Sequence, residues 1–320
     1  MKGVFLDADS MGTDLDFLRL KNSIPHFHAH HISSSDEVIP RLHGAEIAIV
    51  NKVILGEKEF AACPNLKLVA VTATGTNNID LAAAKARGIR VCNVTQYGRP
   101  TIVQHTFSLI LALANRLLDY VEDVRQGKWH SSPVFCLMHH PIIELEGKTI
   151  GIIGYGDLGR GVARMAEAFG MKVLLGARHG QDASTVDGYP RLPLNELLPQ
   201  VDVLSLHCLL SNETRNLIDA QALSLMKPSA FLINVARGGL IDEDALAQAL
   251  IDQRLAGAAT DVLSQEPPVN GNPLLNWAIP NLIITPHCAW ASKEARQRLL
   301  DKTADNIEQF LNGSLTHYVV

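Results

Sequence analysis

The chain has 320 residues, which is enough for two domains that each bury a core of their own. Apolar residues make up 47% of the chain and charged residues 19%, and the formal net charge is -5, so a nucleic-acid partner is not expected. No apolar run approaches the roughly 20 residues that a membrane span requires, so a membrane partner is not expected either.

The amino-terminal stretch MKGVFLDADS has an acidic residue by position 7 and no long apolar core. We therefore interpret it as a first strand and not as a signal peptide. The cysteines are odd in number and lack paired spacing, which favours a reducing, cytoplasmic location. They are Cys63, Cys92, Cys136, Cys208 and Cys288.

Short strands alternate with helical patterns over the first third of the chain. Strands are predicted at VFLD (4–7), IAIV (47–50), LKLVAVT (66–72) and RVCNV (90–94). The stretch HFHAHH would place His26, His28 and His30 on one face of a further strand, as a metal site requires. Because no cysteine or carboxylate is clustered beside them, a solvated strand face is favoured and no metal site is predicted.

Two helices indicate where the domains meet. A long apolar helix is predicted over 101–121, after Gly98 and Pro100, which are typical of a boundary. An amphipathic helix over 292–313 is expected to return to the first domain. We therefore expect a substrate (catalytic) domain of residues 1–98 and 291–320, with a dinucleotide-binding domain of residues 99–290 inserted into it.

The inserted domain is predicted to be a doubly wound α/β sheet. Its strands are expected at KTIGIIG (148–154), MKVLLG (171–176), VDVLSLH (201–207), AFLINVA (230–236), AGAATDVL (256–263) and NLIITPH (281–287). Their spacing leaves room for one crossover helix each. The first of these helices, over 157–169, should face the sheet with one apolar stripe. The stripe consists of Leu158, Val162, Met165, Ala166 and Phe169.

The motif GYGDLG (154–159) joins the first of these strands to its helix. Gly154 permits the tight turn, Gly156 lets the backbone approach a pyrophosphate, and Gly159 lets the helix pack closely on the strand. The amino terminus of the helix would then present free N–H groups to the phosphates. In this strand–helix setting the motif predicts dinucleotide binding.

Three polar residues follow three different strands of this sheet: Arg237, Glu266 and His287. The carboxyl ends of parallel strands line the ligand crevice, so these side chains should meet there, although each alone could be a solvated loop charge. An arginine fork suits a substrate carboxylate. A histidine can exchange a proton with a carbonyl oxygen, while a neighbouring glutamate orients the imidazole and favours its protonated form. The set indicates hydride transfer to a 2-oxo acid.

Several ordered motifs carry a resemblance that spans nearly the whole chain. They are ATGTNNID, VQHTFSLILAL, HHPIIELEGKTIGIIGYGDLGRGVARMAEAFGMKV, INVARGGLIDEDAL, ATDVLSQEPP and TPHCAWASKEARQRLLD. The chain resembles the D-2-hydroxyacid dehydrogenase family, and within it the bacterial hydroxypyruvate reductases, also called glycerate dehydrogenases. The resemblance implies a Rossmann nucleotide-binding domain inserted into a flavodoxin-like substrate domain.

The resemblance also implies a reaction: reduction of hydroxypyruvate or glyoxylate to D-glycerate or glycolate. Arg237 would bind the substrate carboxylate and polarise the carbonyl, His287 would be the acid/base, and Glu266 would pair with it. Another D-2-hydroxyacid specificity is an alternative. A second alternative is a nucleotide-sensing regulatory protein of the same fold, like the related C-terminal binding protein corepressors, which can retain these three residues.

Further contacts follow from the same resemblance. Family members dimerise through the nucleotide domain with the helix that VQHTFSLILAL (103–113) matches, so a homodimer is expected, although plain core packing also explains those residues. Asp261 would hold the nicotinamide carboxamide. The substrate carboxylate would meet the backbone of Thr74, Gly75 and Thr76, and the cofactor would contact Gly154, Tyr155, Gly156, Asp157, Leu158, Gly159, Ala177, Arg178, His179, Cys208, Ala236 and Asp261.

The end of the second strand of the inserted domain bears on the choice of cofactor. Ala177 stands where the family usually has an acid for the ribose of NAD, and Arg178 follows it with a charge that could pair with the 2′-phosphate of NADP. NADP(H) is therefore favoured and NAD(H) is possible. Asp182 and Asp187 could replace the acid only if the loop folds back.

Two cysteines adjoin these predicted contacts. Cys208 ends the strand VDVLSLH and is expected to be a small buried residue near the cofactor. Cys288 directly follows His287, but adjacent residues of an extended chain point in opposite directions, so a nucleophilic thiol pair is disfavoured.

Overall fold

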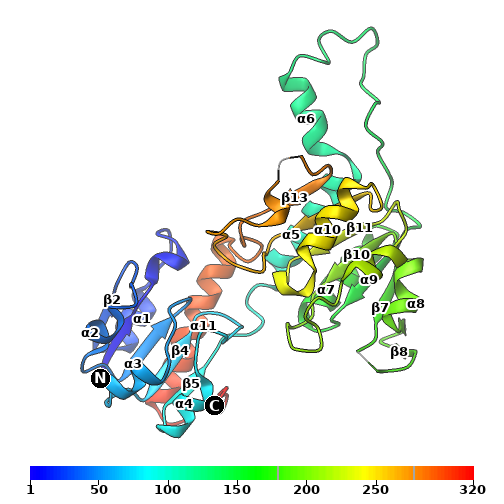
Figure 1. The fold of residues 1–320 in the computed structure, drawn as a ribbon. Helices are drawn as coiled ribbons and strands as arrows, with labels where there is room; N and C mark the ends of the chain where they lie inside the picture. The colour runs from blue at the N-terminus through cyan, green and yellow to red at the C-terminus, as the bar shows by residue number, and fades with distance from the viewer. Residues whose placement is uncertain (179, 277) are drawn as a thin grey trace. The chain divides into compact units, whose positions relative to one another are not determined.

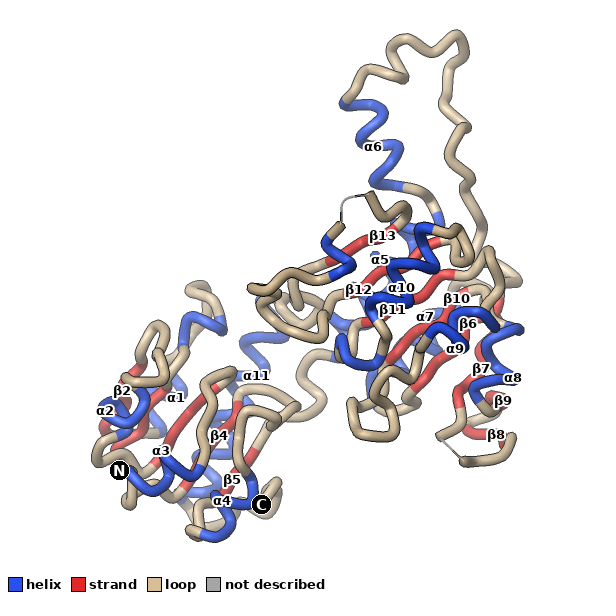
Figure 2. The backbone as a smooth tube through the Cα atoms, in the orientation of Figure 1, coloured by secondary structure: helices blue, strands red, loops and turns tan. Residues whose placement is uncertain are grey.

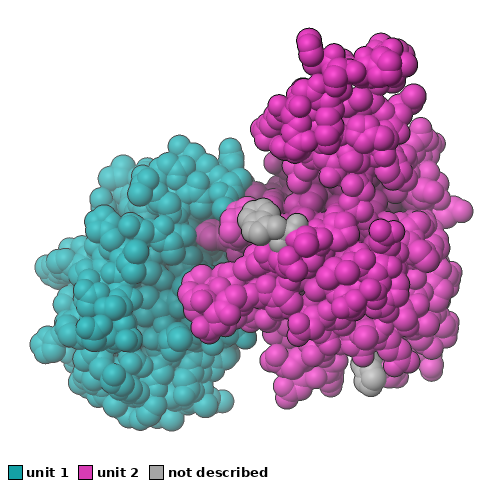
Figure 3. Space-filling view, turned by 45° about the horizontal axis from the view of Figure 1, so that its top comes forward, with its two compact units in different colours: residues 1–98, 291–320 teal, residues 99–290 magenta. Residues whose placement is uncertain are grey.

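The computed structural model describes residues 1–178, 180–276 and 278–320. These residues form two compact units, coloured separately in Figure 3. Unit 1 consists of Met1–Gly98 and Ala291–Val320, and unit 2 is Arg99–Trp290. Each unit has its own parallel sheet and its own core, so each is described separately.

Unit 1 contains a five-stranded parallel sheet with the order β2-β1-β3-β4-β5, the order of a flavodoxin-like fold. Every residue of the inner strands β3 and β4 is buried, and so is all of the inner strand β1 except Lys2, as expected for strands covered on both faces. The strands are β1 (Lys2–Phe5), β2 (His26–Ala29), β3 (Ile47–Val50), β4 (Leu68–Val71) and β5 (Arg90–Cys92). The helices are η1 (Ala8–Met11), α1 (Leu18–Ser23), α2 (Val38–Leu42), α3 (Glu57–Ala62), α4 (Leu81–Ala86) and α11 (Lys293–Leu311).

Helix α11 belongs to unit 1 although it follows the whole of unit 2 in the chain. The side chain of Ser292 caps its amino terminus by accepting a hydrogen bond from the N–H of Ala295. Leu299, Leu300 and Ile307 are buried on one side of the helix. The amphipathic pattern over 292–313 therefore marks a helix that completes the core of unit 1.

Strand β2 is the edge strand that carries the histidine-rich stretch. The side chains of His26 and His28 are exposed. Among the residues that the structure describes, no group of side chains that could hold a metal includes a residue of β2. His26 and His28 lie on a solvated strand face, whereas His30 follows the strand and is partly buried, and the expectation that these histidines hold no metal stays a prediction.

Unit 2 contains an eight-stranded sheet with the order β13-β12-β11-β10-β6-β7-β9-β8, parallel except for the β8–β9 hairpin. The doubly wound Rossmann order 3-2-1-4-5-6 lies within it. The strands are β6 (Thr149–Ile153), β7 (Lys172–Gly176), β8 (Ser184–Val186), β9 (Tyr189–Leu192), β10 (Val203–Leu206), β11 (Phe231–Asn234), β12 (Gly257–Thr260) and β13 (Leu282–Ile284). The helices are α5 (Arg99–Ala114), α6 (Leu117–Arg125), α7 (Asp157–Ala168), α8 (Leu194–Leu197), η2 (Leu198–Gln200), α9 (Ala220–Leu225), η3 (Gly238–Leu240), α10 (Glu243–Ile251) and η4 (Pro273–Leu275).

Successive residues of the central strands of unit 2 point into two different cores. On β11, Phe231 and Ile233 pack with α5 and α7, whereas Leu232 packs with the helices on the opposite face. This alternation explains why the strands read as continuous apolar runs. All six strands predicted for this part of the chain are present, and the hairpin of β8 and β9 is an addition at the edge.

The single helix predicted over 101–121 is wrong. Helix α5 ends at Ala114, and α6 begins at Leu117 after Arg116, which has a left-handed backbone (φ 50°). Figures 1 and 2 show α6 and the coil that follows it extending away from the sheet of unit 2. Among the described residues no single helix is long and apolar enough to cross a membrane; α5 and α6 pass that test only when taken together, and they are bent by 61°.

The apolar stripe predicted for the first crossover helix is partly wrong. Val162 and Ala166 of α7 are buried as predicted, but Leu158 is only partly buried, Met165 is 40% exposed, and Phe169, directly after the helix, is 36% exposed. The buried face also includes Gly159 and Ala163, whose small size lets the helix lie close to the sheet. This rotates the larger Met165 towards the solvent.

Candidate active site

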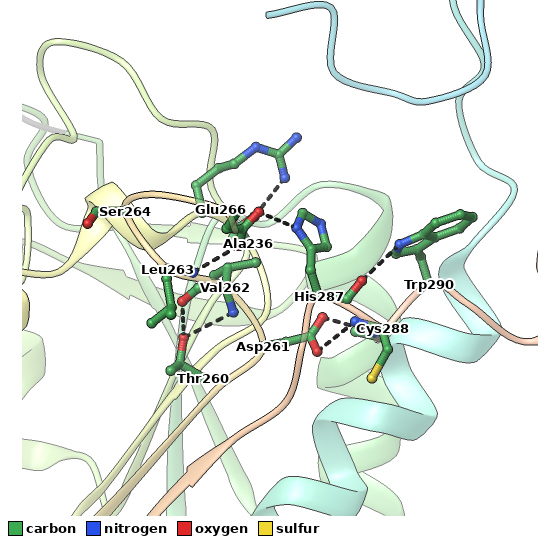
Figure 4. A network of polar contacts seen from close by, with 12 residues as sticks. Ala236, Thr260, Asp261, Val262, Leu263, Ser264, Glu266, His287, Cys288 and Trp290 are labelled. Carbon is green, nitrogen blue, oxygen red and sulfur yellow. Dashed lines mark hydrogen bonds and ion pairs between the residues drawn. The ribbon is translucent and has the colours of Figure 1, made fainter. Parts of the chain in front are cut away.

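Arg237, Glu266 and His287 follow the adjacent parallel strands β11, β12 and β13, so they emerge at the same edge of the sheet. Figure 4 shows the pair formed by His287 and Glu266. The Nδ1 of His287 lies 2.6 Å from Oε2 of Glu266, and Oε1 of Glu266 accepts a 2.9 Å hydrogen bond from the N–H of Leu263. The glutamate is thus fixed by the backbone and orients the imidazole, with Nε2 on the far side of the ring.

Hydrogen bonds and close backbone packing fix the loop that carries Arg237. Its Nη1 donates to the carbonyl of Ala236 at 2.7 Å, while the side chain of Asn234 donates to the carbonyl of Arg237 at 2.9 Å. A Cβ on the next residue, Gly238, would lie 1.9 Å from the carbonyl carbon of Leu263. The arginine loop therefore packs directly on the segment that leads to Glu266, and glycine is required after Arg237.

His287 has a left-handed backbone, with φ 53°. Its N–H donates to the carbonyl of Asp261 at 2.7 Å and to that of Thr285 at 3.0 Å, and its own carbonyl accepts from Nε1 of Trp290 at 3.0 Å. A non-glycine residue with this backbone is uncommon, and it persists only where its surroundings hold it. The turn that carries His287 is therefore a fixed and locally strained element.

Asp261 is the residue that holds this turn, with 1% of its surface exposed. Its Oδ1 accepts hydrogen bonds from the N–H of Cys288 at 2.9 Å and the hydroxyl of Thr285 at 2.5 Å, and its Oδ2 accepts from the N–H of Ala289 at 2.8 Å. Figure 4 shows the carboxylate beneath the turn. The sequence did not predict this anchoring role, and its predicted contact with the nicotinamide carboxamide stays a prediction.

His105 on α5 extends the same set of contacts. Its Nε2 lies 3.1 Å from Oγ1 of Thr285 and 3.6 Å from Oδ1 of Asp261. Sequence reasoning missed both His105 and Thr285. Gln104, Thr106 and Ser108 of the same segment are polar too, so nothing in the sequence singled out His105.

Neither cysteine beside the site is prepared to act as a nucleophile. Burial raises the pKa of the Cys288 thiol, and burial raises that of Cys208 to about 11. Both sulfur atoms therefore stay protonated at neutral pH. Cys208 is only partly buried, and not buried as predicted, and the expectation that neither cysteine is reactive stays a prediction.

The fold restricts two of the three glycines of GYGDLG to glycine and leaves the third unrestricted. Gly154 has φ 95°, and a Cβ there would lie 2.4 Å from the backbone nitrogen of Cys208. A Cβ on Gly159 would lie 2.2 Å from the carbonyl oxygen of Gly154, whereas a Cβ on Gly156 would meet no atom within 4 Å. The fold needs the first and third glycines, but it leaves open space beside Gly156 at the amino terminus of α7. A pyrophosphate group fits this arrangement.

The remaining residues of this motif pack on their own unit. The ring of Tyr155 meets Tyr189 edge-on at 5.8 Å, and the guanidinium of Arg160 lies 5.0 Å from its centroid. Oδ1 of Asp157 accepts from Nη1 of Arg99 at 2.8 Å, and Leu158 is partly buried. Contacts of these residues with a cofactor stay predictions.

A pocket of about 350 Å³ lies at the carboxyl end of β7 and includes Ala177 and Arg178. Asp182 and Asp187 do not line it, and Asp187 instead pairs with Arg160 at 3.2 Å. Among the described residues, the acid in this pocket is Asp219, whose Oδ1 caps α9 by accepting from Ala222 at 2.8 Å. The prediction for His179 falls outside the described residues.

His207 is a further residue that sequence reasoning missed at this edge. It follows β10, and its Nε2 lies 2.8 Å from the hydroxyl of Ser205. Its Nδ1 is inaccessible to solvent and has no hydrogen-bond partner among the described residues. Burial lowers the pKa of this imidazole to about 4, so it is neutral at pH 7.

The predicted substrate loop lies in unit 1, directly after β4. The hydroxyl of Thr74 donates to the carbonyl of Val94 at 2.9 Å, and the carbonyl of Thr76 accepts from Ile79 at 3.0 Å. Gly75 is partly exposed between them. Because this loop and Arg237 belong to different units, the proposed contact of Thr74, Gly75 and Thr76 with the substrate stays a prediction.

Comparison with known proteins gives consistent matches. Residues 107–289 match the family model described as "D-isomer specific 2-hydroxyacid dehydrogenase, NAD binding domain". A glycerate dehydrogenase from Methylorubrum extorquens is 46% identical over 98% of this chain and 96% of its own, and a hydroxypyruvate reductase from Blautia hydrogenotrophica is 40% identical over 90% and 89%. The structure of an acyclic imino acid reductase in complex with NADPH and D-Arg superposes with a TM-score of 0.84 and 31% identity over the full length of both chains.

Proposed function

Because the chain belongs to the D-isomer specific 2-hydroxyacid dehydrogenase family, and so transfers a hydride between a nicotinamide cofactor and a 2-oxo or 2-hydroxy acid, we propose that its substrates are hydroxypyruvate and glyoxylate. The products are D-glycerate and glycolate. The names of the relatives that cover most of the chain support this small, polar substrate class.

The observation that carries the catalytic assignment is the 2.6 Å contact between His287 and Glu266 at the strand edge that also bears Arg237. In the reducing direction, Nε2 of His287 donates a proton to the carbonyl oxygen, and in the oxidising direction it takes that proton back. Glu266 positions the ring and stabilises its positive charge. Arg237 binds the carboxylate with its planar fork and polarises the carbonyl.

The chain's own groups also account for cofactor binding. The backbone at Gly154 and Gly156, with the amino terminus of α7, binds the pyrophosphate. When bound, the nicotinamide supplies or accepts the hydride. The fixed turn at His287 keeps the acid/base in place, so no rearrangement of that residue is needed during the reaction.

A panel of 2-oxo acids tests the substrate proposal. Hydroxypyruvate or glyoxylate should have the highest kcat/KM, and D-glycerate should be oxidised in the reverse direction. If a bulky branched or aromatic 2-oxo acid exceeds both by tenfold or more, the substrate assignment is wrong. That result would leave the assignment of the acid/base unaffected.

We propose NADP(H) as the preferred cofactor. Two features support it: Ala177 supplies no carboxylate to repel a 2′-phosphate, and Arg178 lines the pocket where that phosphate would lie. Of the described residues that line this pocket, Asp219 is the acid that would favour NAD(H), but one of its oxygens already caps α9. The ratio of kcat/KM for NADPH to that for NADH, measured with one substrate, tests the preference.

We also propose a homodimer formed through unit 2. The apolar side chains Val103, Phe107 and Ile110 of α5 are buried within unit 2 itself, so α5 alone offers little apolar surface to a second copy. Helix α6 and the coil after it instead expose an unusual run of large apolar side chains, as at an interface. They are Leu117, Leu118, Val121, Val124, Trp129, Val134, Phe135, Met138 and Ile142.

Light scattering after size exclusion tests the dimer. The purified chain should have twice its monomer mass, and Leu118→Asp with Phe135→Asp should shift it to the monomer. Ile32→Asp is a matched control, because Ile32 on unit 1 is 71% exposed, between Leu118 at 56% and Phe135 at 88%. A monomeric wild-type chain would contradict the proposal.

A further inference from the structure

We propose that Asp123, His139 and His140 form a binding site for a zinc-like divalent metal ion. The three residues, called the Asp123 cluster below, join α6 to the coil that returns from it. Nε2 of His139 lies 2.6 Å and Nε2 of His140 lies 2.8 Å from Oδ2 of Asp123. The three ligand atoms all lie within 4.8 Å of one another.

The backbone around the cluster already holds the two rings together. Adjacent residues of an extended chain point in opposite directions, yet the rings of His139 and His140 converge, with centroids 4.3 Å apart. Tyr120 fixes this bend, because its hydroxyl donates to the carbonyl of His140 at 2.8 Å and accepts from the N–H of His140 at 3.2 Å. Both rings also pack edge-on against Tyr120. The two rings are thus held beside each other before an ion binds.

Two imidazole nitrogens and one carboxylate oxygen are the donor set of zinc sites that keep an open coordination position. Zn–N and Zn–O bonds of about 2.1 Å place neighbouring ligands of a tetrahedral site about 3.4 Å apart. The separations of 2.6 and 2.8 Å would therefore have to widen by about 0.8 Å for His139 and about 0.6 Å for His140. In the single chain the Asp123 side chain is 4% exposed and that of His139 is 47% exposed, so the histidine side is the open side of the cluster.

Lys128 limits how tightly the ion is held. Its Nζ lies 2.6 Å from Oδ1 of Asp123, the oxygen that does not face the histidines. Lys128 first, and then the two histidines, lower the pKa of Asp123 to about 2, so the carboxylate is always ionised near neutral pH. The ammonium group is half-exposed and can turn towards solvent, but its charge opposes a cation at the same carboxylate.

Because Lys128 pairs with the proposed ligand Asp123, substituting Lys128 distinguishes a metal site from an ordinary group of ion pairs. If the cluster only ties the coil to α6, replacing Lys128 removes a stabilising partner and nothing else. If it binds a metal, Lys128→Met removes the opposing charge and should tighten zinc binding by about fivefold, the size of a unit charge a few ångströms away in water.

The experiment uses the full chain, stripped with a chelator, dialysed, and titrated with zinc against a chromophoric competitor. One zinc ion per chain should bind, and His139→Gln with His140→Gln should weaken its binding by about 100-fold or more. His140→Gln alone should give a smaller loss, and circular dichroism confirms that each variant is folded. His130→Gln is the matched control, because His130 is exposed in the same segment and outside the cluster.

Three results would overturn the proposal. The first is the absence of zinc binding, and the second is binding that survives the double substitution. In the second case the ion lies elsewhere, for example at His105, Asp261 and Cys288, which Cys288→Ser would reveal. The third is Lys128→Met with unchanged or weaker binding.

Discussion

Replacing Thr285 with valine tests whether Asp261 holds the catalytic turn. Valine keeps the shape of threonine but removes the hydroxyl that donates to Oδ1 of Asp261 at 2.5 Å. Asp261 is 1% exposed, so water cannot replace this donor, and a hydrogen bond to a buried charged group contributes about 1.5–3 kcal/mol. We expect the free energy of unfolding to fall by about 2 kcal/mol.

The same change should slow the reaction. Asp261 keeps its hydrogen bonds from Cys288 and Ala289, so the turn persists but is held less firmly around the left-handed residue His287. When about 1.4 kcal/mol of this lost free energy is added to the activation barrier because the imidazole is less well positioned, kcat falls about tenfold. The change in KM for the 2-oxo acid should be smaller.

Steady-state kinetics and urea unfolding measure the two effects, and Thr285→Ser, which retains the hydroxyl, should stay within about twofold of the wild type. Thr285→Val with wild-type kcat and stability would show that the hydroxyl does not support Asp261. Reduced stability with unchanged kcat would show that the anchor has no link to His287.

Four other predictions concern single residues. His287→Ala should lower kcat by about 100-fold or more, whereas Arg237→Ala should raise KM for the 2-oxo acid and lower kcat together; near-normal kcat in the first variant would remove the acid/base assignment. Arg178→Ala should reduce kcat/KM for NADPH by about tenfold and leave NADH nearly unchanged, and equal losses with both would contradict the phosphate contact. His207 should destabilise the chain as the pH falls from about 6.5 to about 4, because its unfolded form binds a proton that the buried form, with its pKa lowered to about 4, does not. Between about pH 6.5 and pH 4, the free energy of unfolding measured with urea should fall less for His207→Gln than for the wild type, by up to about 3 kcal/mol. If the two proteins lose stability equally over this range, the role of His207 is refuted.

The sequence was sufficient to predict which residues meet at the strand edge. Arg237, Glu266 and His287 follow apolar strands whose carboxyl ends lie side by side, and the structure pairs Glu266 with His287, while the role of Arg237 stays a prediction. The positions of the central strands were also predictable, because buried parallel strands appear in the sequence as uninterrupted apolar runs.

Features that depend on local backbone choice were not predictable. Arg116 adopts a left-handed conformation without a glycine or proline to signal it, so the helix break there was missed. The hairpin of β8 and β9 is short and partly exposed, with Pro190 inside it, and so lacks a strand pattern. The contacts of His105 and Thr285 with Asp261 join residues that are far apart in the chain, and no local pattern reports them.

The empty space beside Gly156 has a practical consequence for mutational surveys. A screen that scores folding, expression or thermal melting should treat alanine at this position as silent, since the added methyl group meets nothing in the chain, while Gly154 and Gly159 register strongly. In a screen for growth or turnover, substitution of any one of the three glycines should be harmful. A position at which alanine leaves folding unchanged but abolishes activity is therefore one where the backbone contacts a bound ligand and not another part of the chain.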